Sequence, residues 1–368
     1  MNKLVTCCFI SMAILLSACT SNGKYSKDAL FPSGDYMSVS HKKVKLSSIF
    51  PQHRLIPLET NDASLIGGRG NKVIKRDSCF YVESNNAILC FDNNGRFLRR
   101  MAHQGSGPGE YAEITDFDVV PSPKGGAELW ISSVSGLQIY NAASGDFMRK
   151  MNMNKSIHQF RYVNENTVLI ITSDDYIFHV CDMSGHIRKD FYEKDLANST
   201  HKFNQFFTYQ GKVAYQLGDT QTAIVYDPET DDCDLQPILQ PQENVLTPDI
   251  SRDYYDKYGY LEQYERLGNS YTQLSTIRAM GNDAIFTWIA PERNYLLTVF
   301  SSSGYKTVPF SAIENDLIPT STNLFLATII ACESDPASTW LFQIPAEFIQ
   351  QEGVNKEDNF WLLEVSLR

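Results

Sequence analysis

The most informative stretch of this chain is HQGSGPGEY at residues 103–111. Strand-like sequence flanks it on both sides, with ILCFDNNGRFL at 88–98 and the alternating ITDFDVV at 114–120. The stretch therefore predicts a rigid corner that joins the outer strand of one small sheet to the inner strand of the next. Its three glycines allow backbone angles that other residues avoid, and a proline fixes one φ angle among them: Gly105, Gly107, Gly109 and Pro108.

This corner is not a phosphate-binding loop. A phosphate loop needs Lys followed by Ser or Thr and then a helix, whereas here Glu110 stands at that point and a strand-like sequence follows. We expect Glu110, beside Tyr111, to anchor the turn by accepting hydrogen bonds from backbone N–H groups.

Strand-like segments that end in a polar residue and a tight turn recur along the chain. Asp, Asn or Ser opens each turn and Gly closes most of them, as β-turns prefer. The segments are 88–91, 137–140, 177–181, 223–226 and 296–300. Apart from the last, they recur roughly every 40 to 50 residues, the length of a four-stranded antiparallel unit, and this period is typical of a β-propeller.

We count six such units and predict an all-β fold, a six-bladed β-propeller over residues 44–368. The predicted blades are 65–103, 110–153, 155–195, 199–240, 269–312 and a last one that begins near 321. The last blade offers only three strand-like segments, 323–330, 339–344 and 360–367. We expect the segment 54–58 (RLIPL) to supply its outermost strand and so close the ring with both termini in one sheet.

An insertion before blade five, residues 241–268, differs in composition from the repeats. Its apolar and aromatic residues fit one amphipathic helix that lies over a propeller face. Aromatic rings can stack on sugars, and the same stripe can serve only to pack the helix on its sheet, so both interpretations stay open. The stripe consists of Tyr254, Tyr255, Tyr258, Tyr260, Tyr264, Leu261 and Leu267.

The first residues have the form of an export signal. One basic residue, Lys3, precedes an apolar run from Leu4 to Leu16 that is too short to cross a bilayer as a stable helix. Small residues directly before Cys19 resemble the lipobox of bacterial lipoproteins, in which the cysteine becomes an acylated N-terminus. We therefore predict a signal peptide at 1–18, lipidation at Cys19, and a polar tether over 19–43.

The chain is acidic, with 43 Asp and Glu against 32 Lys and Arg and a formal charge of −11. This charge disfavours nucleic acid and anionic lipid surfaces as partners. The cysteines after Cys19 include no CxxC pair, which disfavours a zinc site. Cys79 and Cys90 flank a predicted hairpin turn, and we leave open whether they form a disulfide or stay as buried thiols.

With the corner, the repeat and the lipobox in place, the chain resembles the six-bladed β-propeller lipoproteins of Gram-negative gut bacteria, which are related to NHL-repeat propellers. The resemblance is carried by RLIPLET (54–60), residues 88–98, GSGPGEY (105–111) and residues 114–120. It implies an outer-membrane lipoprotein of the cell envelope, and the family has no generally assigned catalytic residues. Nutrient or glycan capture is associated with it only loosely.

Three histidines offer the strongest candidate for chemistry. His103, His158 and His201 fall near links between blades, and such links gather on one face of a propeller around the channel mouth. They could share a divalent metal, with Asp116 or Glu113 as a base, and so support a lyase or hydrolase.

The leading hypothesis is different: a non-catalytic binding or scaffolding module for a small molecule, a glycan or an envelope protein. It assigns no catalytic residue and no cofactor. Its predicted ligand face consists of His103, His158, His201, Asp116, Tyr254, Tyr255 and Tyr258.

Overall fold

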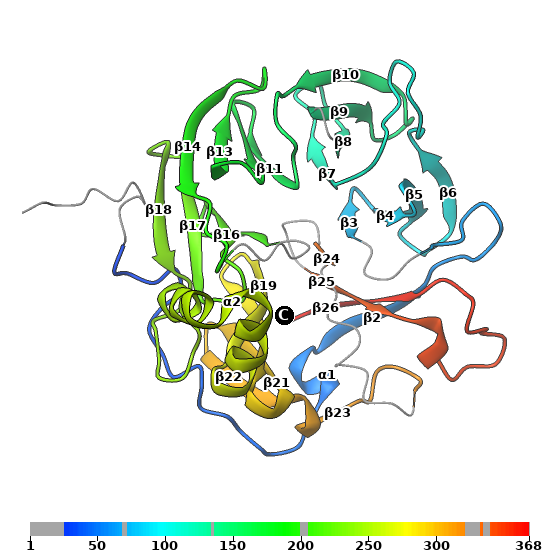
Figure 1. Ribbon diagram of the computed structural model, residues 1–368. Coiled ribbons are helices and arrows are strands. Elements are labelled where there is room, and N and C mark those ends of the chain that lie inside the picture. Colours follow the sequence, from blue (N-terminus) through cyan, green and yellow to red (C-terminus); the bar gives the residue numbers. More distant parts are fainter. Residues whose placement is uncertain are drawn as a thin grey trace, which may run out of the picture.

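The computed structural model describes residues 26–67, 72–133, 136–198, 205–320, 332–333 and 339–367. Small antiparallel sheets follow one another around a central axis (Figure 1), which confirms the predicted six-bladed β-propeller. In blades one to five the first strand lies at the axis and the last at the rim.

The strands match the predicted blades closely. Blade one holds β3 (Val73–Arg76), β4 (Cys79–Ser84), β5 (Ala87–Asp92) and β6 (Phe97–Met101), and blade two holds β7 (Asp116–Pro121), β8 (Ala127–Ser133), β9 (Gly136–Asn141) and β10 (Phe147–Asn152). Blade three holds β11 (Gln159–Asn164), β12 (Thr167–Ile171), β13 (Tyr176–Cys181) and β14 (Ile187–Glu193). Blade four holds β15 (Phe206–Tyr209), β16 (Lys212–Gln216), β17 (Thr222–Asp227) and β18 (Asp232–Pro237), and blade five holds β19 (Gln273–Met280), β20 (Asp283–Ala290), β21 (Asn294–Ser301) and β22 (Gly304–Pro309).

Blade six closes the ring as predicted. Its described strands are β25 (Trp340–Ile344), β26 (Trp361–Ser366) and, at the rim, β2 (Gln52–Pro57), which pairs antiparallel with β26. Glu364 of β26 strengthens this seam, because its carboxylate pairs with Arg54 at 2.7 Å and with Lys75 of blade one. The inner strand expected at 323–330 lies outside the described residues.

Short elements complete the ring. Parallel pairing joins β24 (Cys332–Glu333) to β3 and β1 (Val44–Lys45) to β23 (Ile313–Glu314). The helices are α1 (Leu46–Ile49) and α2 (Pro248–Ser270), with 3-10 turns η1 (Pro291–Arg293), η2 (Phe310–Ala312) and η3 (Ala346–Phe348). Within the described part of the chain, no helix is both long and apolar enough to cross a membrane.

The corner at 103–111 takes its shape from side chains around it. The Glu110 carboxylate accepts a hydrogen bond from the Gly107 N–H at 2.8 Å, as the pattern predicted. Gly109 has a φ of +79°, and a Cβ there would lie 2.7 Å from the Phe147 ring. Tyr111 is buried and donates its hydroxyl to the carbonyl of Asn86 in blade one at 2.9 Å. The corner therefore joins blade one to blade two.

The predicted tether is wrong for its described part, residues 26–43. The Phe31 N–H donates to the carbonyl of Ile238 at 3.0 Å, and the Tyr36 hydroxyl donates to Gln221 at 2.8 Å. Phe31 and Tyr36 are both 1% exposed and fill the apolar groove between blades four and five. We call residues 26–43 the strap, because they pack along the propeller. Burial of the two aromatic rings stabilises this packing.

The helical insertion is present, but as two arms. Gly259, with φ 74°, interrupts α2, so the expected single helix is kinked there. One wall of α2 packs through Ser251, Gln263 and Leu267, which are buried. The helix contacts η1, the turn between β20 and β21, and so lies over blade five on one face of the propeller (Figure 1).

Cys79, Cys90, Cys181 and Cys233 are free thiols, so the open question about Cys79 and Cys90 is answered in favour of unbonded side chains. Burial raises the pKa of the Cys90 thiol to about 12, with Cys79 close beside it.

Candidate functional site

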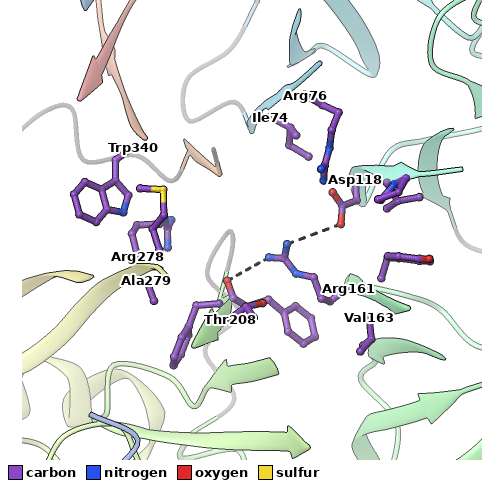
Figure 2. Close-up of a pocket in the computed structure, with 15 residues that line it drawn as sticks. Ile74, Arg76, Asp118, Arg161, Val163, Thr208, Arg278, Ala279 and Trp340 are labelled. Carbon is purple, nitrogen blue, oxygen red and sulfur yellow. Dashed lines mark hydrogen bonds and ion pairs between the residues drawn. The ribbon is translucent and has the colours of Figure 1, made fainter. Parts of the chain in front are cut away.

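A cavity of about 330 Å³ lies on the propeller axis (Figure 2). Blades one to five repeat one antiparallel order, so their inner strands run in the same direction and the C-terminal ends of these strands meet at one end of the channel. The cavity lies at that end. Each blade contributes to its lining, with Arg76, Asp118, Arg161, Thr208, Arg278 and Trp340 as one residue from each. We call this space the axial cavity.

Three arginines of the axial cavity come from alternate blades: Arg76 from one, Arg161 from three and Arg278 from five. Each is held by a backbone carbonyl. Arg76 Nε donates to Val119 O at 3.1 Å, Arg161 Nη2 to Phe206 O at 3.4 Å, and Arg278 Nη1 to Ile277 O at 2.6 Å. The guanidinium groups are therefore positioned by the scaffold around one space.

Asp118 is the acidic residue among the described lining residues. Its Oδ1 accepts the Val119 N–H at 2.8 Å, and its Oδ2 lies 3.9 Å from Arg161 Nη1. Figure 2 shows this carboxylate between Arg76 and Arg161. Three cations against one anion make the described lining positive, although the whole chain carries a formal charge of −11.

Aromatic side chains complete the lining. Phe206 lies under the Arg161 guanidinium, 5.8 Å from ring centroid to Cζ, and Trp340 lies beside Arg278 across the cavity (Figure 2). Such a wall offers flat apolar faces next to cationic donors.

At the opposite end of the same inner strands, buried polar contacts link neighbouring blades. Lys72 Nζ pairs with Asp116 Oδ1 at 2.9 Å, and Asp116 Oδ2 accepts the Phe160 N–H at 3.0 Å. Further along, Gln205 N donates to Gln159 Oε1 at 3.2 Å, and Gln216 Nε2 donates to Leu274 O at 2.7 Å. We call this set the buried belt: Lys72, Asp116, Gln159, Gln205 and Gln216. It links blades one to five through buried polar contacts.

The predicted ligand face does not coincide with the axial cavity. His103 and His158 precede the inner strands β7 and β11, so they lie at the belt end. His158 Nε2 bonds Ser173 Oγ, and Asp116 belongs to the buried belt. His201 lies outside the described residues, so a shared metal stays a prediction. Within the described ranges, no three His, Cys, Asp or Glu side chains form a group that could hold an ion.

The tyrosine stripe divides into two groups. Tyr254 packs against Tyr258 and Tyr271 with ring centroids 5.6 and 5.8 Å apart, and Tyr255 is half-buried. Tyr260 and Leu261 are 52% and 84% exposed. The residues named for ligand capture thus help to pack α2, while the exposed ones lie on its second arm.

Sequence reasoning missed the three arginines. Each one interrupts an otherwise strand-like inner segment, as in VIKR (73–76), QFRYV (159–163) and STIRAM (275–280). The available signal was an Arg in the first strand-like segment of every second predicted blade, namely the blades that span 65–103, 155–195 and 269–312.

Structural and sequence comparisons place the fold. A crystal structure of a Bacteroides fragilis NCTC 9343 protein, described as exported, aligns with a TM-score of 0.69 and 15% identity over 89% of this chain and 98% of that one. The Neurospora crassa Pan2 WD40 domain aligns with a TM-score of 0.43 and 8% identity, over 80% of this chain and 74% of that one. No curated protein matches the sequence. A family described as "Domain of unknown function (DUF4934)" matches residues 36–237, more than half of the chain, which therefore belongs to that family.

Proposed function

We propose that this protein is an exported, lipid-anchored module of the cell envelope that binds a small molecule in its axial cavity without transforming it. One observation carries the proposal: all six blades contribute side chains to one axial space, in which scaffold-held arginines lie next to aromatic faces. Small-molecule sites are concave, mostly apolar spaces with a few well-placed polar groups, and about 300 Å³ is the lower end of their usual size.

The location rests on the N-terminal sequence. Lys3, the apolar run that follows it and the small residues before Cys19 are the features of a lipoprotein signal. The aligned Bacteroides fragilis protein, which is described as exported, supports the same location. The first described residue of the strap, Ser26, donates its N–H to Leu235 of β18, so a lipid on Cys19 would attach near the rim of blade four.

Binding is tested by blocking the cavity. Thr208 is exposed on the inner strand β15 and lines the axial cavity, so Thr208→Trp fills the space without disturbing the core. We expect this variant to lose at least ten-fold in affinity for any small solute that raises the melting temperature of the native protein. Thr230→Trp, in the exposed rim turn of the same blade, is the matched control. Equal binding by both variants would place the site elsewhere.

The anchor is tested separately. Cys19→Ser removes the thiol that would be acylated, and we expect the protein to move from the membrane fraction to the soluble fraction of the producing cell. Retention of the variant in the membrane fraction would contradict lipid anchoring at this residue.

A further inference from the structure

We propose that the ligand of the axial cavity is a hydroxylated organic carboxylate about the size of one sugar ring, bound by Arg76, Arg161 and Arg278. This inference rests on the proposed function and names the chemistry of its ligand. A carboxylate accepts two parallel N–H bonds from one guanidinium group and is attracted by the charges of the others, neither of which a neutral solute can match.

The placement of the arginines favours a single small anion. They reach the cavity from alternate blades, so they approach the axis from different sides, and Figure 2 shows Arg76, Arg161 and Arg278 around the same space. A carboxylate on the axis lies within the reach of N–H donors from more than one side, which suits a small anion better than a long one.

Each arginine also has a structural contact with a backbone carbonyl. These contacts are compatible with ligand binding, since they hold the guanidinium groups in position before a ligand enters. A preorganised site loses less side-chain freedom on binding.

Asp118 restricts the rest of the ligand. Its carboxylate lines the same cavity as the arginines, so it disfavours a second anionic group there and accepts hydrogen bonds from hydroxyl donors. The aromatic faces of Phe206 and Trp340 suit the C–H face of a ring. Together these side chains select one carboxylate, several hydroxyls and a compact ring.

The test uses calorimetric titration of the purified mature protein with D-glucuronate, D-glucose, benzoate and inorganic phosphate. We expect glucuronate to bind at least ten-fold more tightly than each of the other three, and its affinity to fall as salt is raised. Equal binding of glucose, tighter binding of benzoate or phosphate, or no binding of glucuronate overturns the inference.

Variants assign the effect to the site. Arg161→Met should lower glucuronate affinity at least ten-fold, while Arg188→Met, on the outer strand of the same blade, should leave it unchanged. Asp118→Asn should raise the affinity for the diacid D-glucarate relative to glucuronate by several-fold. No change with Arg161→Met or Asp118→Asn overturns the inference. If Thr208→Trp abolishes glucose binding and glucuronate binds no more tightly than glucose, only the ligand class is wrong. If Thr208→Trp changes the affinity for no solute, the proposed function fails as well.

Discussion

The two ends of the propeller channel are built from the same strands but satisfy their polar groups in different ways. In β7, Asp116 and Asp118 lie two residues apart and therefore on one side of the strand. Asp116 pairs with Lys72 and accepts the Phe160 N–H, which joins three blades. Asp118 instead borders the axial cavity, 3.9 Å from an arginine. One end of the ring is thus used for closure, which leaves the other end available for recognition.

The largest expected difference lies between these two aspartates. Asp116→Asn removes the 2.9 Å charge pair with the Lys72 ammonium, which is 5% exposed, and breaking a buried ion pair in this way costs about 3 to 5 kcal/mol of unfolding free energy. Asp118 is also buried, at 6% exposed, but its ion pair with Arg161 is long at 3.9 Å, so Asp118→Asn should cost less, about 1 to 2 kcal/mol. Urea denaturation of both variants measures the difference. Similar losses would show that the cavity end also holds the ring together.

A second comparison uses two glycines at opposite ends of blade two. Gly109 has φ +79° with the Phe147 ring in the way of a Cβ, whereas Gly125, in the β7–β8 turn, has φ +90° and nothing within 4 Å. Both Ala variants suffer the left-handed backbone penalty of about 1 to 2 kcal/mol. Gly109→Ala should lose roughly a further 1 to 3 kcal/mol from overpacking. Equal melting temperatures would mean that the corner at 103–111 accommodates an added Cβ as easily as the β7–β8 turn does.

The seam between blades six and one gives a pH-dependent effect. Burial raises the pKa of Glu364, but hydrogen bonds from Lys75, Arg54 and Thr339 outweigh burial and leave that pKa below its ordinary value of 4.5. A carboxylate with a depressed folded pKa stabilises the protein above its unfolded pKa, and this contribution disappears as pH falls through the folded pKa. Glu364→Gln should therefore cost about 1.5 to 3 kcal/mol at neutral pH and progressively less below pH 4.5.

The control for the seam is Glu314→Gln. Glu314 pairs with Lys43 at 3.0 Å, but the side chains are 48% and 77% exposed, so the loss should stay below about 1 kcal/mol. Denaturation at several pH values compares the two variants. A Glu364→Gln loss that does not shrink in acid would show that Glu364 stabilises the seam by packing rather than by charge.

The sequence predicted the ring well because each blade is formed by residues that are close together in sequence. Strand alternation and Asp, Asn or Gly turns are encoded within a few residues, and the unpaired segment at 54–58 left one place to pair, beside β26. The strap was missed because its apolar residues, Phe31 and Tyr36 among them, are scattered among polar and small ones, and only the groove between blades four and five makes them core. The cavity was missed for a similar reason. The sequence does not show which end of β11 joins the buried belt and which end borders the cavity, because the belt contacts join residues of different blades. It therefore could not show that the cavity lies at Arg161 rather than at His158.

The smallest expected effect is also the most discriminating. Arg161→Met keeps an unbranched stem against Phe206 and removes a 3.9 Å ion pair and a 3.4 Å hydrogen bond, so unfolding free energy should change by less than about 1 kcal/mol. If Arg161 linked blades in the way that Asp116 does, Arg161→Met would lower the unfolding free energy by several times as much. A variant that keeps its stability but loses its affinity for a small carboxylate would show that one strand serves two roles. In β11, Gln159 links two blades, whereas Arg161, two residues later, binds the ligand.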